Sequence, residues 1–253
     1  MFVVFVIGMA GSGKSLLVGA LSDYLRSSEQ NVVTLNLDPG ATALPYNPDV
    51  DVRLYVDIDE LMEKYKLGPN GALVMASDIA ADHLEEIRGE LEEEAPDFVL
   101  ADTPGQIELF AFRESGPFFS RAISSEPKAV VYVLDAPFCK NPMNFVSNLF
   151  LAAAVYTRLR QPQVYALTKA DLVSEEELER IVAWGSEIEQ LEDALEATSG
   201  EPSSLIARDL AMAVHATGLV YEPTPVSARS SLGLVDLNAS LTRALTAGEE
   251  LRP

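Results

Sequence analysis

A glycine-rich stretch near the start of the chain has the residue types that hold phosphate groups. Residues 8–15 read Gly-Met-Ala-Gly-Ser-Gly-Lys-Ser, which fits the pattern G-x-x-x-x-G-K-S/T between an apolar run and a helical segment. Glycines let backbone N–H groups curl around phosphate, and the start of the following helix adds positive potential. We expect Lys14 to reach the β- and γ-phosphates of a nucleoside triphosphate and Ser15 to ligate Mg²⁺. The expected contacts are Gly11, Ser12, Gly13, Lys14, Ser15 and Leu16.

A second polar stretch begins at Asp102, directly after the apolar run 97–101. A carboxylate at the carboxyl end of a central parallel strand lies where a ligand of Mg²⁺ or of its bound water belongs. In the residues that follow, Gly105 can turn its N–H toward the γ-phosphate, Gln106 can orient an attacking water, and Glu108 can support that water. An ordinary strand-to-helix turn is the alternative. The pattern predicts a hydrolytic centre beside the phosphate loop, with Lys14 as a further catalytic group.

Asp38 closes the apolar run 31–37 in the sequence Asn-Leu-Asp-Pro. At the same edge of the sheet, its carboxylate can bind a magnesium-bound water or polarise the nucleophile. The alternative is a turn in which Asp38 merely caps the strand before the proline.

The sequence Thr168-Lys169-Ala170-Asp171 follows the apolar run 164–167 and resembles the base-recognition element of GTPases. A carboxylate at Asp171 can accept from the ring N–H and the exocyclic amine of guanine, donors that adenine lacks on that edge. The stem of Lys169 can pack on the base. Thr168 replaces the commoner asparagine, which leaves ATP open as a substrate. Ser227 and Ala228 resemble the last base-contacting loop of the same proteins.

The elements that must position these residues alternate between strand and helix. Short apolar, β-branched runs are typical of strands buried on both faces, and they occupy residues 2–7, 31–37, 97–101, 129–134 and 164–167, with a sixth run ending near 225–226. Helical spacing covers residues 15–26, 58–65, 82–94, 141–159 and 174–184. This order predicts an α/β fold with a doubly wound, mostly parallel sheet of the P-loop NTPase type. We expect one domain over residues 1–253, with a helical insertion at about 185–221.

Composition narrows the classes of partner. A formal net charge of −21 argues against direct binding to nucleic acid or to an anionic membrane. The single cysteine, Cys139, excludes an internal disulfide and suits a reducing cytoplasm. The apolar start is too short for a membrane span and leads directly into the phosphate loop.

Taken together, these motifs resemble the GPN-loop GTPases, in particular the homodimeric archaeal type. The likeness runs through most of the first 175 residues. Besides the stretches above, it rests on Leu44-Pro45-Tyr46 through Asp51-Val52-Arg53 and on Gly68-Pro69-Asn70-Gly71-Ala72. Taken alone, the second of these patterns would be only a tight bend.

The resemblance implies hydrolysis of GTP to GDP by a homodimer that pairs its subunits across the nucleotides. It implies that Gly68, Pro69 and Asn70 form a loop inserted into the partner's site, where Asn70 reaches the phosphate and water region. Asp38, Gln106 and Glu108 would surround the attacking water, while Ser15 and Asp102 would hold Mg²⁺. Loss of the γ-phosphate would then change the surface offered to other proteins, as in a switch for protein assembly.

Two further classes stay open on the residues alone. In one, the chain is an assembly scaffold for which nucleotide is a slow structural ligand. In the other it is a kinase, since small-molecule and polynucleotide kinases share the phosphate loop; Asp171 and Gln106 argue against this class.

Overall fold

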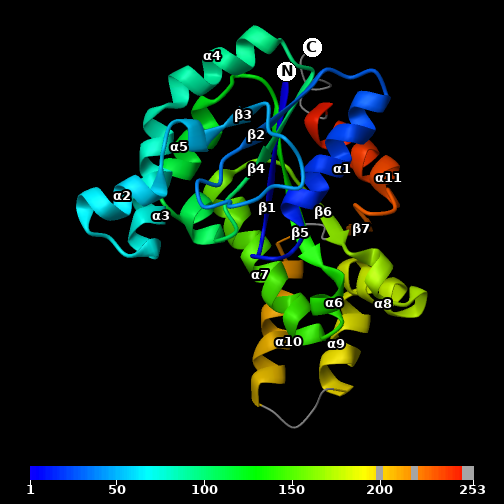
Figure 1. The fold of residues 1–253 in the computed structure, drawn as a ribbon. Helices are drawn as coiled ribbons and strands as arrows, with labels where there is room; N and C mark the ends of the chain where they lie inside the picture. The colour runs from blue at the N-terminus through cyan, green and yellow to red at the C-terminus, as the bar shows by residue number, and fades with distance from the viewer. Residues whose placement is uncertain (198–201, 218–221, 247–253) are drawn as a thin grey trace.

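The computed structural model describes residues 1–197, 202–217 and 222–246, and its centre is a parallel sheet (Figure 1). The sheet has seven strands in the order β3-β2-β4-β1-β5-β6-β7, and each pair is parallel. The strands are β1 (Phe2–Gly8), β2 (Val32–Asn36), β3 (Val50–Asp51), β4 (Phe98–Asp102), β5 (Lys128–Asp135), β6 (Gln163–Thr168) and β7 (Pro223–Pro225). Strand order reverses at β1, which lies between β4 and β5. Ligands of open α/β sheets bind at such a reversal, so the loop after β1 is well placed for one.

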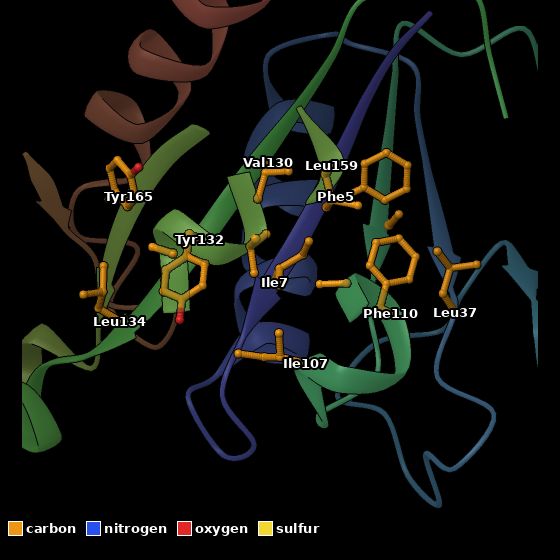
Figure 2. Packing of buried hydrophobic residues seen from close by; sticks show 14 of the residues in the cluster. Phe5, Ile7, Leu37, Ile107, Phe110, Val130, Tyr132, Leu134, Leu159 and Tyr165 are labelled. Carbon is orange, nitrogen blue, oxygen red and sulfur yellow. The ribbon is translucent and has the colours of Figure 1, made fainter. Parts of the chain in front are cut away.

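The residues of β1 explain why this strand is central. Val3 through Ile7 are fully buried, and alternate side chains enter different cores. Phe5 and Ile7 pack with Phe110 and Ile107 on one face (Figure 2). Val4 and Val6 pack on the other face. A strand buried on both faces is the expected consequence of helices covering both sides of a parallel sheet.

The helices form two layers around the sheet (Figure 1). One face is covered by α1 (Lys14–Ser27) and α11 (Leu234–Thr246). The other helices are α2 (Ile58–Tyr65), α3 (Pro69–Asp82), α4 (Leu84–Glu94), α5 (Ser115–Ala122), α6 (Ala136–Cys139), α7 (Pro142–Leu159), α8 (Glu175–Ser186), α9 (Ile188–Ala197) and α10 (Pro202–His215). Short helical turns cover Val52–Leu54, Glu108–Phe112 and Ala170–Leu172, and the second of these is π-helical.

Most elements expected from the sequence are confirmed, including the start of α8. There Ser174 and Glu177 form the reciprocal hydrogen bonds of a capping box. Within the expected insertion at 185–221, α9 and α10 extend together away from the sheet (Figure 1). Residues 198–201 and 218–221 of that interval lie outside the described part of the chain.

Two local expectations were wrong. The pattern at residues 68–71 favoured a tight bend, but Pro69 is the first residue of α3 and Gly68 its N-cap. Proline at this position loses no helical hydrogen bond and has the right φ, so the same residues suit a helix start. The helix expected at 82–94 is the later part of a longer region, which is divided at His83 into α3 and α4. The two-residue strand β3 was not foreseen.

Gly116 in α5 should tolerate no side chain, because a Cβ there would lie 1.6 Å from the carbonyl oxygen of Phe110. We expect Gly116→Ala to lower the free energy of unfolding by about 1–3 kcal/mol, as overpacking does. A Cβ on Gly89 in α4 meets nothing within 4 Å. Gly89→Ala is therefore the matched control and should stabilise by about 0.5–1 kcal/mol. Urea unfolding measures both; equal midpoints would contradict the close contact at Gly116.

Candidate functional site

The phosphate loop, residues 8–15, joins the carboxyl end of β1 to α1 and depends on its glycines. Gly11 and Gly13 have φ of 75° and 95°, in the left-handed region that favours glycine. A Cβ on Gly8 would lie 2.7 Å from the carbonyl oxygen of Val133. The backbone conformation and close packing at Gly8, Gly11 and Gly13 therefore favour glycine, as a phosphate loop requires.

Lys14 is buried against this loop, and its Nζ donates to the carbonyl oxygen of Met9 at 3.2 Å. Burial lowers the pKa of Lys14, while the charges of Asp102 and Asp38 oppose this shift. The Lys14 amine thus faces two carboxylates with little water around it.

Asp102 ends β4 and is also buried, at 1% exposure. Burial raises the pKa of Asp102 to about 6, against opposing effects of Ser15, Lys14 and Tyr46. The phenol of Tyr46 donates to Asp102 Oδ2 at 3.2 Å. Burial, followed by the charge of Asp102, raises the pKa of Tyr46 well above its usual value, so the phenol stays protonated.

Two buried oxygens at this edge have no hydrogen-bond partner among the described residues, namely Ser12 Oγ and Asp102 Oδ1. Buried polar atoms are nearly always satisfied, so these oxygens point to a bound group or to water. With the Ser15 hydroxyl, Asp102 supplies the hard oxygen donors that Mg²⁺ prefers. No cluster of three or more His, Cys, Asp or Glu gathers as a metal site within the described ranges. Mg²⁺ held by nucleotide phosphates, water and one or two protein oxygens requires no such cluster.

Asp38 joins the turn after β2 to the turn after β4. Its Oδ1 accepts from Gly40 N at 2.9 Å, so the turn considered as the alternative role is formed. Its Oδ2 accepts from Gly105 N at 3.3 Å. The N–H that we expected to face the γ-phosphate therefore points to a carboxylate in this structure.

A chain of largely buried polar side chains holds the backbone around Asp38. Sequence reasoning assigned no individual role to Asn36, Asp51 or Arg53. Asn36 accepts from Asp38 N at 3.0 Å and donates to Asp51 Oδ1 at 2.9 Å. Arg53 binds both oxygens of Asp51 and donates to the carbonyl oxygen of Ala41 at 2.8 Å. Burial would raise the pKa of Asp51, but hydrogen bonds from Arg53 and Asn36 outweigh it and lower the pKa. The sequence signal that could have identified this polar chain is Asn36, a polar residue inside the apolar run 31–37.

The expected water-site residues lie at the surface. Gln106 and Glu108 are exposed, and Glu108 begins the π-helical turn. Gly68, Pro69 and Asn70 are exposed at the start of α3. A Cβ on Gly40 would lie 2.6 Å from Leu73 Cδ2, so the first turns of α3 adjoin the Asp38 turn.

The expected base-recognition element is tied directly to the phosphate loop. Thr168 Oγ1 lies 2.6 Å from the Ser12 carbonyl oxygen and 2.9 Å from that of Leu134. Lys169 Nζ donates to the Gly11 carbonyl oxygen at 2.7 Å and to Asp135 Oδ2 at 2.5 Å. One chain of contacts therefore fixes both loops.

A pocket of about 160 Å³ opens beside these residues. Its lining consists of Gly13, Leu16, Thr168, Lys169, Asp171, Leu172, Ala228 and Arg229. Leu172 and Arg229 were not anticipated, whereas Ser227 is buried and accepts from Ser230 N at 3.3 Å within its own turn. Apolar walls with a carboxylate at the rim suit a flat, polar-edged ring.

Known proteins resemble this chain in sequence and in fold. A family model described as "Conserved hypothetical ATP binding protein" matches residues 6–247. A Pyrococcus abyssi protein named GPN-loop GTPase PAB0955 is 40% identical over 76% of each chain. The crystal structure of PAB0955, titled a GTPase in apo form, superposes with a TM-score of 0.84 at 34% identity, over 96% of this chain and 97% of that chain.

The chain belongs to the GPN-loop GTPase family. GPN-loop GTPase QQT2 of Arabidopsis thaliana is 32% identical over 90% of this chain but only 60% of its own length. The chain thus spans about three fifths of that plant member of the family. As a GPN-loop family member it has the seven-stranded parallel sheet of P-loop NTPases. No helix over the described residues is long and apolar enough to cross a membrane.

Asp102 should make the nucleotide-free protein sensitive to pH. Its folded-state pKa of about 6 lies above the usual aspartate pKa of 3.8, so ionisation costs stability as pH rises through this interval. Asp102→Asn should therefore be more stable than wild type above pH 6, by about 3 kcal/mol, with the difference vanishing near pH 4. Urea unfolding in EDTA between pH 4 and 8 measures it. A difference that does not change with pH would show that the carboxylate is not the cause.

Proposed function

We propose that this chain is a single-domain, Mg²⁺-dependent GTPase that hydrolyses GTP to GDP and phosphate as a nucleotide-bridged homodimer. The observation that carries the proposal is the pocket in which Asp171 and Lys169 adjoin the phosphate loop. A nucleotide with its phosphates on residues 8–15 directs its base toward this pocket. The curated relatives are named GTPases, whereas the family description mentions ATP. Asp171 favours guanine, because its carboxylate matches the two N–H donors on that base edge.

In the proposed complex, Ser15 and Asp102 hold Mg²⁺ through the hydroxyl and a bound water. When bound, the ion neutralises charge that develops on the phosphoryl oxygens. Lys14 contacts the β- and γ-phosphates from its buried position and supplies a cation where charge grows in the transition state. Catalysis of this kind is mainly positioning and electrostatic stabilisation.

The contact between Asp38 and Gly105 supports a switch. A γ-phosphate that accepts from Gly105 N displaces the Asp38 carboxylate, which currently accepts that bond. The released carboxylate then faces the attacking water together with Gln106 and Glu108. When phosphate leaves, Asp38 returns to Gly105. The turns after β2 and β4 thus move together with the nucleotide state.

The partner subunit is proposed to complete the site. Gly68, Pro69 and Asn70 are exposed, and their helix adjoins the Asp38 turn through Leu73. In the dimer, Asn70 enters the facing site and contacts the phosphates or the water. Met9 occupies the position where some dimeric P-loop ATPases have an additional lysine. Asn70 is therefore the candidate group acting in trans. Protein clients in the cytoplasm would bind the dimer surface that changes with the nucleotide state.

Nucleotide selectivity tests the base assignment. Wild type with Mg²⁺ should release phosphate from GTP much faster than from ATP and should be a dimer in solution with a non-hydrolysable GTP analogue. Asp171→Asn should lower kcat/KM for GTP by roughly 100-fold, because the amide carries no charge and replaces one of the two acceptor oxygens by an N–H donor that faces the N–H donors of guanine. The same variant should gain activity with XTP, whose 2-carbonyl accepts from the new amide.

Equal use of ATP and GTP by wild type would contradict the role of Asp171. A nucleotide-bound dimer without hydrolysis would favour the scaffold class, and transfer to an acceptor would favour a kinase.

Complementation tests the action of Asn70 in trans. Asn70→Ala and Lys14→Ala should each be nearly inactive alone, for lack of the trans group and of the phosphate contact respectively. Mixed dimers contain one complete site, so an equal mixture should recover up to about a quarter of wild-type phosphate release. As the matched control, mixing Asn70→Ala with the Asn70→Ala/Lys14→Ala double variant should recover none. Trans insertion is wrong if both mixtures behave alike.

A further inference from the structure

The two oxygens of the Asp102 carboxylate have different surroundings. Oδ2 accepts from the Tyr46 phenol at 3.2 Å, whereas Oδ1 is buried and makes no hydrogen bond to a described residue. The Ser15 side chain also lies close enough to lower the pKa of this carboxyl. Buried polar atoms are nearly always hydrogen-bonded, so Oδ1 is available to a bound group or to water. A donor fixed on one oxygen therefore determines the direction in which the other is presented.

Tyr46 is itself held in place by elements on both sides. A Cβ built on Gly19 would lie 3.4 Å from the Cβ of Tyr46. Gly19 lies on α1, one helical turn beyond Ser15. Tyr46 thus packs against α1 at the level of Gly19. Tyr46 therefore spans from α1 to the end of β4, although 56 residues separate it from Asp102.

The segment that carries Tyr46 is anchored a few residues later. Asp49 Oδ2 accepts from Thr34 N at 2.7 Å and from Thr34 Oγ1 at 2.7 Å. It also accepts from Arg26 of α1 at 2.8 Å. The segment after β2 is therefore fastened to β2 and α1 just beyond Tyr46, which limits how far the phenol can move.

We infer that Tyr46 is a positioning residue for Asp102: the phenol holds Oδ2 so that Oδ1 is presented to a magnesium-bound water. This inference rests on the proposed function, in which Asp102 serves the metal. It assigns a role to part of the stretch at residues 44–46, which neither the phosphate loop nor the base site explains. Groups that hydrogen-bond a metal ligand in this way typically change metal affinity by 10- to 100-fold.

The test is Tyr46→Phe, which keeps the ring beside Gly19 and removes only the hydroxyl. Two quantities are measured on the full chain: release of a fluorescent GDP analogue against free Mg²⁺, and Mn²⁺ binding to the GDP complex by electron paramagnetic resonance. We expect the Mg²⁺ concentration for half-maximal GDP retention to rise about 10-fold, with a matching loss of Mn²⁺ affinity. GDP binding in EDTA should be unchanged. Tyr24→Phe is the matched control, because Tyr24 is also partly buried but lies on α1. This variant should behave as wild type.

Three distinguishable results would overturn the inference. An unchanged Mg²⁺ requirement in Tyr46→Phe would show that the phenol does not position the carboxylate. An equal loss of GDP binding with and without metal would show a purely structural role. If wild type retains GDP equally well in EDTA and in Mg²⁺, the magnesium site of the proposed function fails, and this inference fails with it.

Discussion

Lys14 and Asp102 place opposite charges where water is largely excluded, and the surrounding structure is organised around that arrangement. Burial opposes ionisation of both groups, and each charge offsets part of the cost of burying the other. The strand order brings β1 and β4 together and so delivers the two residues to the same edge. Thr103 strengthens this junction, because its hydroxyl donates to the carbonyl oxygen of Val6 at 2.8 Å. Nucleotide phosphates and a divalent ion would complete an arrangement that the protein alone leaves with unsatisfied oxygens.

Helix α3 connects the parts of the structure that the proposed switch would move. Near its start, Leu73 packs against Gly40 in the Asp38 turn. Farther along, Asp78 accepts from Arg113 at 2.7 Å, just beyond the π-helical turn that Glu108 begins. The hydrogen bond from Arg113 lowers the pKa of Asp78, so this ion pair persists at neutral pH. One helix therefore touches both segments, and Asn70 lies in its exposed first turn.

The sequence was informative wherever a few adjacent residues determine the outcome. The phosphate loop, the strand before Asp102 and the helix that begins after Ser174 are local patterns, and each lies where it was expected. Residues 68–71 were misinterpreted because glycine and proline suit a bend and a helix start equally well. Tyr46 and Arg53 belong to stretches that resemble the family, but the sequence alone predicts no contact for either residue. Their contacts with Asp102, Asp51 and Ala41 depend on how distant segments pack, which residue spacing does not reveal.

Thr168 has a consequence for how firmly the two loops are joined. A hydroxyl carries one proton, yet Thr168 Oγ1 lies within hydrogen-bonding distance of the carbonyl oxygens of both Ser12 and Leu134. At any instant it donates to only one of them. The amide of an asparagine has two N–H groups and could serve both acceptors at once. In this chain the single Thr168 proton therefore serves either the phosphate loop or β5, while Lys169 Nζ holds the phosphate loop separately through the Gly11 carbonyl oxygen.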